Sequence, residues 1–308
     1  MALDKYYQMP WPREIDPAVE AYKQWCLMRA RRIQEHTGRL WPQERDMINE
    51  MYALGEVMLR HYHMWTGPRD EFYEVIGTED KFHMWVPIFD GDSRFLEDIY
   101  LTFAGRIDGR VRDVRTGDLY LLEFKTIGRI NNARWVMRSL QSPAYAWAAS
   151  TSEEVKGVIY RFLWKTPPQT LKWLTASKRF SMAKGQKTSY EWARSDIEKW
   201  AVGNDMDPIE AAKQYRPFLL ALHEEGNKYF EEYIVPRTRI QMDNAIRAVY
   251  AYGKIMSDPD VLIFPSGGYH CSYCPFADPC ALKERGMDYQ GLLDAEYGTR
   301  TYWEKEEA

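Results

Sequence analysis

The chain has 308 residues, of which 45% are hydrophobic and 28% are charged; these values are typical of a folded globular protein and exclude wholesale disorder. Its 41 basic and 45 acidic residues give a net charge of −4, which argues against a protein that coats nucleic acid through bulk charge. No apolar run approaches the roughly 20 residues that span a bilayer, and the first residues contain no apolar signal core. We therefore expect a cytoplasmic protein with no membrane partner.

The first part of the chain is predicted to be helical. Asp16-Pro17 is typical of a helix start and predicts a helix over 16–35 that stops before Gly38. A second helix is predicted over 42–65, where Gly67-Pro68 would end it.

Strands are predicted next. Residues 81–88 predict one strand, and 100–114 with 119–126 predict a hairpin around a short turn that contains Gly117. Residues 155–164 predict a further strand.

The remaining segments are predicted to be mostly helical. Asn131 or Asn132 can cap a helix that runs to about Ala149. Further helices are expected after Ser189, Asp207-Pro208 and Pro236.

This order predicts an α/β fold with a mixed central β-sheet, wrapped by helices from both ends of the chain. We expect a single domain over 1–308 with four parts. The N-terminal helices take up 1–70, and the core sheet with its helix takes up 71–165. A basic loop with a helical region follows over 166–260, and a C-terminal segment with an acidic tail ends the chain over 261–308.

The predicted hairpin carries a candidate metal site. Glu123 and Lys125 are two residues apart in one strand, so the pleat points both to one face, and Asp108 of the other strand comes beside Glu123 if the strands pair around Gly117. Carboxylates suit Mg²⁺ or Mn²⁺, which activate water and neutralise phosphate charge. The alternative is a cross-strand salt bridge on a solvated face. Against it, Leu119 and Leu121 share that face, where an unpaired carboxylate would be costly.

These residues resemble a known family. Gly105-Arg106-Ile107-Asp108-Gly109 and Leu121-Leu122-Glu123-Phe124-Lys125-Thr126 resemble the G-x-x-D and E-x-K motifs of the PD-(D/E)XK nucleases. Gln141-Ser142-Pro143-Ala144-Tyr145 is similar to the Q-x-x-x-Y motif of their RecB-like branch.

The resemblance implies a restriction-endonuclease-like fold and a role for each matching residue. Asp108, Glu123 and the backbone carbonyl of Phe124 would be metal ligands, and Lys125 would be the catalytic lysine. Gln141 and Tyr145 would face the DNA and the site, although packing of an amphipathic helix on the sheet also explains their spacing.

One motif of the branch is altered. The RecB-like pattern has a histidine four residues after a glycine, whereas here Gly55 is followed at that distance by Leu59. Glu56 and His61 are the nearby candidates for this metal ligand, although a lone histidine on such a helix is more often a packed or exposed residue.

The four cysteines suggest a metal centre. Cys271, Cys274 and Cys280 are clustered, and Cys26 lies far upstream, so general spacing rules leave zinc and an iron-sulfur cluster as alternatives, beside four independent buried thiols. The pattern resembles iron-sulfur nucleases of the AddB and CRISPR-adaptation types, which implies a structural 4Fe-4S cluster that joins the N- and C-terminal helical parts.

Residues 172–190 mix cations with aromatic side chains, a composition that suits nucleic acid or a solvated basic loop. The candidate DNA-binding residues are Lys178, Arg179, Lys184 and Lys187.

The family resemblance as a whole implies a Mg²⁺- or Mn²⁺-dependent DNA exonuclease of phage or bacterial recombination and repair. It would need a free DNA end, and a recombinase or a single-strand-binding protein would be its partner. A CRISPR-adaptation nuclease and a catalytically silent DNA-binding clamp of the same fold are the alternatives.

Overall fold

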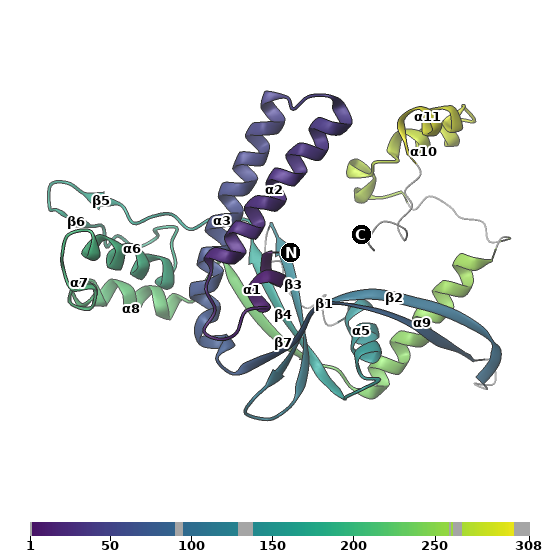
Figure 1. Cartoon of the computed structure of the whole chain (residues 1–308), viewed down its shortest axis with the longest axis horizontal. Helices are drawn as coiled ribbons and strands as arrows, with labels where there is room; N and C mark the ends of the chain where they lie inside the picture. The colour runs from purple at the N-terminus through teal and green to yellow at the C-terminus, as the bar shows by residue number, and fades with distance from the viewer. Residues whose placement is uncertain (1, 90–94, 129–137, 259, 261–266, 299–308) are drawn as a thin grey trace. The chain divides into compact units, whose positions relative to one another are not determined.

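The computed structural model describes residues 2–89, 95–128, 138–258, 260 and 267–298 (Figure 1). The chain divides into two compact units, Met1–Lys254 and Ile255–Ala308. The expected helix caps Asn131 and Asn132 and the last part of the acidic tail lie outside the described residues.

A five-stranded mixed sheet forms the centre of the first unit. Its strands have the order β1-β2-β3-β4-β7, and the neighbours pair antiparallel except for β3 and β4, which are parallel. The strands are β1 (Tyr73–Phe89), β2 (Phe95–Asp113), β3 (Leu119–Ile127), β4 (Val155–Trp164) and β7 (Phe230–Pro236). The predicted mixed α/β fold is confirmed.

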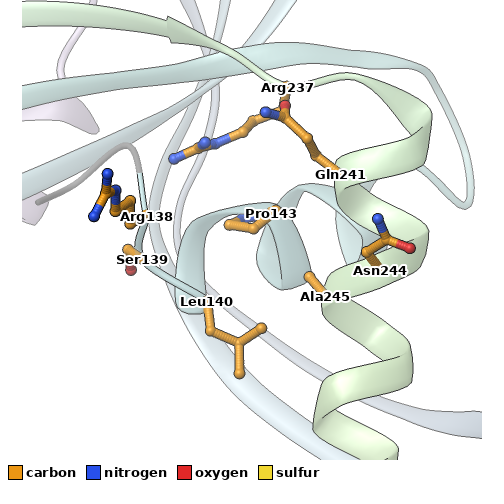
Figure 2. A pocket seen from close by; sticks show the side chains of 8 residues that line it. All are labelled: Arg138, Ser139, Leu140, Pro143, Arg237, Gln241, Asn244 and Ala245. Carbon is orange, nitrogen blue, oxygen red and sulfur yellow. The ribbon is translucent and has the colours of Figure 1, made fainter. Parts of the chain in front are cut away.

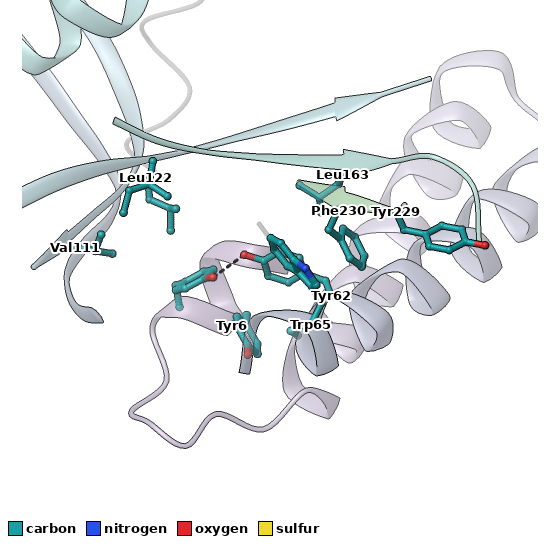
Figure 3. Close-up of a cluster of buried hydrophobic side chains, with 11 residues drawn as sticks. Tyr6, Tyr62, Trp65, Val111, Leu122, Leu163, Tyr229 and Phe230 are labelled. Atoms are coloured by element: carbon teal, nitrogen blue, oxygen red, sulfur yellow. Dashed lines mark hydrogen bonds between the residues drawn. The ribbon is translucent and has the colours of Figure 1, made fainter. Parts of the chain in front are cut away.

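Hydrophobic cores lie on both faces of this sheet. On one face, Ala146 of α5 (Gln141–Ala149) and Met242 of α9 (Arg239–Ser257) pack on Leu121 and Tyr160. On the other, side chains of α1 (Ala2–Tyr7) and α3 (Pro42–Asp70) pack on strand residues, and the Tyr7 and Tyr62 hydroxyls share a hydrogen bond of 2.7 Å (Figure 3). β4 is therefore covered on both faces, which explains its nearly continuous apolar sequence.

Each of the two long N-terminal helices differs from its prediction mainly at one of its ends. α2 (Asp16–Thr37) ends before Gly38, whose φ of 76° suits a left-handed C-cap, but its N-cap is Ile15 instead of Asp16. α3 continues past Gly67-Pro68 to Asp70, so the predicted end was wrong. Proline in the last turn removes one backbone hydrogen bond, and the buried Asp70 at the end of the helix pairs with Arg13 and Arg161.

The predicted hairpin forms. Gly117 has a φ of 77°, as its turn requires, and β3 and β4 begin and end within one residue of their predicted bounds. The strand expected at 81–88 is longer, because β1 pairs along most of β2. β7 was not predicted, and neither were the helices α1 and α8 (Arg216–Glu225).

The segment between β4 and β7 has a core of its own. It contains β5 (Trp173–Leu174), β6 (Arg179–Phe180), α6 (Tyr190–Val202), α7 (Pro208–Gln214) and α8. Ser189 and Asp207 cap α6 and α7 as predicted. Buried side chains such as Phe180, Ile197 and Leu219 pack together there, and we call residues 165–229 the insertion.

A buried charge network joins four elements of the first unit. Arg161 of β4 is 1% exposed and pairs with Asp70 of α3 at 2.7 Å and with Glu232 of β7 at 2.8 Å. It also donates to the hydroxyls of Tyr7 and Tyr62. Each buried charge thus has a partner, as a low-dielectric interior requires.

The second unit contains a 3-10 turn, Tyr269–Tyr273, and the helices α10 (Ala277–Glu284) and α11 (Tyr289–Glu296). Phe276 stacks on Tyr297 with ring centroids 5.2 Å apart. That the whole chain forms one domain stays a prediction. In the described ranges, no helix has the length and apolar character needed to cross a bilayer.

Candidate active site

Asp108 lies where β2 and β3 separate. Their ladder ends at the pair Gly109 and Leu122, and beyond it the Phe124 backbone N–H donates to Asp108 Oδ2 at 3.0 Å. The carboxylate therefore replaces the next backbone partner of β3. The two strands diverge here, and the hairpin brings Asp108 and Glu123 together as predicted.

Glu123 and Lys125 complete this group. The Lys125 ammonium donates to Glu123 Oε1, and the Glu123 side chain is 13% exposed. Burial raises the pKa of Glu123 above its ordinary value, and the neighbouring Asp108 carboxylate adds to the rise, while Lys125 opposes it. Glu123 is therefore paired with Lys125 in a partly desolvated position, with the Asp108 carboxylate nearby.

A cavity of about 310 Å³ opens beside Asp108 and Phe124. Its walls come from three further elements, α1, α2 and β1. The residues that line it are Ala2, Leu3, Asp4, Tyr22, Trp25, Glu79, Asp108 and Phe124. We call it the catalytic pocket.

Two acidic residues of this pocket were missed by sequence reasoning. Glu79 lies in β1 between Thr78 and Asp80, which pair with Gly109 and Ile107, so Glu79 is level with Asp108. Its carboxylate forms an ion pair with Arg106 at 2.7 Å. Asp4 accepts hydrogen bonds from Thr78 and Gln8. A strand prediction that began before residue 79 would have included Glu79 in the strand, but its φ of 51° means that alternation would not have fixed the direction of its side chain.

The two candidates for the altered first motif have other partners. His61 is 1% exposed, its Nε2 lies 2.7 Å from Ser189 Oγ, and its ring packs edge-on against Phe230. Burial lowers its pKa to about 3, so the ring is neutral near pH 7. Glu56 accepts from Arg60 at 3.0 Å. Neither residue lines the catalytic pocket.

Gln141 and Tyr145 lie on α5 as predicted. Tyr145 packs against Phe82 of β1 with ring centroids 5.1 Å apart, and its hydroxyl approaches Gly105 so closely that a Cβ there would lie 2.9 Å from it. Gln141 is exposed at the first residue of the helix. A cavity of about 270 Å³ lies at this end of α5. Arg138 and Arg237 are among the side chains that line it (Figure 2).

The four candidate DNA-binding cations are exposed in the insertion. Lys178 and Arg179 lie at the β5–β6 hairpin, and Lys184 and Lys187 lie in the loop that follows. This hairpin is on the opposite side of α3 from β2 (Figure 1). The structure thus separates these cations from the catalytic pocket.

None of the four cysteines forms a disulfide. Cys26 is buried in α2 and Cys271 is exposed, while Cys274, just before α10, and Cys280, within it, are partly buried. Cys26 belongs to the first unit and the other three to the second. In the described part of the chain, no three His, Cys, Asp or Glu side chains converge as a metal site requires.

The chemistry of the hairpin group nevertheless suits a divalent cation. Asp108 and Glu123 offer hard oxygen donors, and burial together with the Asp108 carboxylate raises the pKa of Glu123 despite the nearby Lys125. A Mg²⁺ or Mn²⁺ ion would supply further positive charge. The cysteine thiols are soft donors and suit zinc or iron-sulfur chemistry instead.

Comparisons with known proteins give a family match over nearly the whole chain. A family model described as the PD-(D/E)XK nuclease superfamily matches residues 2–281. A solved structure described as the crystal structure of SSO0001 is 11% identical, with a TM-score of 0.34, over 83% of this chain and 94% of that chain. That score is too low to support an inference. No curated protein matches the chain.

Proposed function

Because this chain belongs to the PD-(D/E)XK nuclease superfamily, whose members use divalent metal ions and act on DNA, we propose that it is a DNA exonuclease of the RecB-like branch. It hydrolyses phosphodiester bonds from a free end, in phage or bacterial recombination and repair. The observation that carries this proposal is the group formed by Asp108, Glu123 and Lys125 beside the catalytic pocket.

Each residue of the group has a chemical role. Asp108, Glu123 and the Phe124 carbonyl hold Mg²⁺ or Mn²⁺, which supplies water activation and neutralises phosphate charge. The Phe124 N–H orients the Asp108 carboxylate. Lys125 places a positive charge beside Glu123, where it stabilises the negative charge that develops on the phosphate.

Dependence on a free end is the first test. A plasmid linearised by one cut should be shortened progressively in Mg²⁺ or Mn²⁺, because an exonuclease must engage a strand end. The same plasmid as a covalently closed circle should remain intact over the same incubation. Gel analysis of both forms, with EDTA as the control, measures this.

The outcomes separate the alternatives. Equally rapid cutting of the closed circle would identify an endonuclease and remove the exonuclease assignment. Binding of both forms without cleavage of either would identify a silent clamp.

We further propose that Cys26, Cys271, Cys274 and Cys280 hold a structural 4Fe-4S cluster. All four thiols are free, and three of them lie within ten residues. Thiolates are the ligands of such clusters. Ligands that are distant in sequence couple metal binding to folding.

Replacing Cys26 with serine tests the cluster. Protein purified without oxygen should lose its brown absorbance and its thermal stability, as should the Cys271→Ser variant, because each removes one of four ligands. Iron and zinc analysis with a thermal melt measures this, and Ser272→Ala, an exposed neighbour, is the control. Stoichiometric zinc without iron would contradict the proposal.

We propose that the exposed cations of the insertion bind DNA phosphates. Replacing Lys178, Arg179, Lys184 and Lys187 with alanine should weaken DNA binding and flatten its salt dependence. The log-log slope should fall by about 0.7 to 0.9 for each phosphate that the variant no longer binds. Fluorescence anisotropy at several salt concentrations measures the slope.

A matched control removes other cations of the same insertion. Lys213 and Lys228 are exposed but paired with Glu210 and Glu225. Their replacement should leave the slope nearly unchanged. An unchanged slope in the fourfold variant would show that the basic segment is only solvated.

A further inference from the structure

A second cavity adjoins the catalytic pocket along α2. It has a volume of about 230 Å³ and is lined by Trp25, Met28, Arg29 and Arg32. Trp25 also lines the catalytic pocket, as Asp108 and Phe124 do. The two cavities therefore have one aromatic side chain in common.

The helical repeat places these side chains on one face. Arg29 and Arg32 follow Trp25 by four and seven residues, so all three lie along the same side of α2. The Arg29 guanidinium carbon lies 5.8 Å from the centroid of the Trp25 ring. We call Trp25, Arg29 and Arg32 the α2 track.

The ring of Trp25 is held in place from α3. Tyr22 stacks on Trp25 with centroids 5.8 Å apart and an interplanar angle of 18°, and it also stacks on Tyr52 of α3. The Tyr22 hydroxyl donates to the Met51 carbonyl at 3.0 Å. Trp25 is thus an aromatic surface fixed before any ligand arrives, which lowers the entropic cost of stacking on it.

The cations of the track have no acidic partners in the described part of the chain. Two other arginines of the N-terminal segment are paired, since Arg13 contacts Asp70 and Arg60 contacts Asp16. Arg29 and Arg32 are exposed and, among the described side chains, form no ion pair with a carboxylate. Two such guanidinium groups beside an aromatic ring suit phosphates that flank a base.

We propose that the α2 track binds a single-stranded segment of the DNA substrate directly beside the catalytic pocket. Trp25 stacks on one base, and Arg29 and Arg32 bind the adjacent phosphates. The ligand is single-stranded because the faces of bases inside a duplex are covered by their neighbours. The inference rests on the proposed function and specifies the form of DNA that enters the site.

Binding is measured on the full-length protein in EDTA, so that cleavage cannot contribute. The probes are a fluorescent oligothymidylate and a duplex of equal length. Arg29→Ala with Arg32→Ala should weaken binding of the single strand by about tenfold or more and lower its log-log salt slope by roughly 1.4, the value for two phosphates of a single strand. Binding of the duplex should change by less than about twofold.

The same helix provides a matched control. Lys23 and Arg31 are exposed cations on other sides of α2, so Lys23→Ala with Arg31→Ala removes the same charge from the same helix. This control should change binding of the single strand by less than about twofold. An equal loss of binding in the control pair, or an equal loss of duplex binding, would overturn the proposed role of the α2 track.

Trp25→Leu tests stacking separately from charge. It should weaken oligothymidylate binding about tenfold and leave binding of an abasic oligonucleotide of the same charge unchanged, because only the former offers bases. An equal loss on both probes would contradict stacking.

Cleavage in Mg²⁺ is assayed in parallel on the wild type. Absence of cleavage would remove the proposed nuclease function and leave the binding result standing. Absence of single-strand binding by the wild type would contradict only the proposal that the α2 track binds single-stranded DNA.

Discussion

Replacing Asp108 with asparagine or Glu123 with glutamine is expected to lower the rate of DNA cleavage about a thousandfold or more. Each change removes a charged oxygen ligand and keeps the shape of the side chain. The asparagine carbonyl can still accept from the Phe124 N–H, so the strand geometry is retained. Lys125→Met should have an effect of similar size, because it removes the charge beside Glu123.

Initial rates on end-labelled DNA over a range of Mg²⁺ and Mn²⁺ concentrations measure this effect, and thermal melts verify folding. Glu153→Gln is the control, because Glu153 is an exposed carboxylate paired with Arg112 outside the pocket. Its rate should stay within about twofold of the wild type. Rates within severalfold of the wild type for all three variants, at Asp108, Glu123 and Lys125, would contradict the assignment of the site.

Replacing Arg161 with methionine should lower the free energy of unfolding by about 3 to 5 kcal/mol, because the carboxylates of Asp70 and Glu232 would lose their buried partner. For a unit of this size the melting temperature falls by roughly 2 to 4 °C per kcal/mol. We therefore expect a decrease of about 6 to 20 °C.

Urea unfolding and scanning calorimetry measure this loss. Arg194→Met is the matched control, since Arg194 is half-exposed and pairs with Glu198 at 2.7 Å on the surface of α6. An exposed pair contributes about 0 to 1 kcal/mol. If both variants melted at the same temperature, the buried ion pairs of Arg161 would contribute no more to the free energy of unfolding than an exposed pair does.

The hairpin could be predicted from sequence because its determinants are local. Asp108 and Glu123 are joined by one short turn, and alternation along each strand fixes which side chains meet. β4 could be predicted for a similar reason, since ten consecutive residues carry its apolar pattern.

Features that depend on distant contacts could not be predicted. α3 ends at Asp70, whose partners Arg13 and Arg161 are far from it in sequence. β7 is short and only partly buried, and it is a strand because it pairs with β4 across the insertion.

The position of Glu79 illustrates the same limit within the site. β1 contains register irregularities, and Glu79 has a φ of 51°, so alternation alone does not place its side chain. His61 shows the converse case. Its sequence position suggested a ligand, but its surroundings are supplied by Ser189 and Phe230, more than a hundred residues away.

The insertion begins and ends at paired neighbours of the sheet. Leu163 of β4 pairs with Phe230 of β7, and the Trp164 N–H donates to the Tyr229 carbonyl at 2.9 Å, so the segment leaves and returns at one place. Its length can therefore change in evolution without shifting the register of β3, where the candidate residues Glu123 and Lys125 lie. The cost of closing a loop grows slowly with its length. An exchange of this segment between relatives would thus change the exposed surface of the insertion and leave the positions of Asp108, Glu123 and Lys125 unchanged.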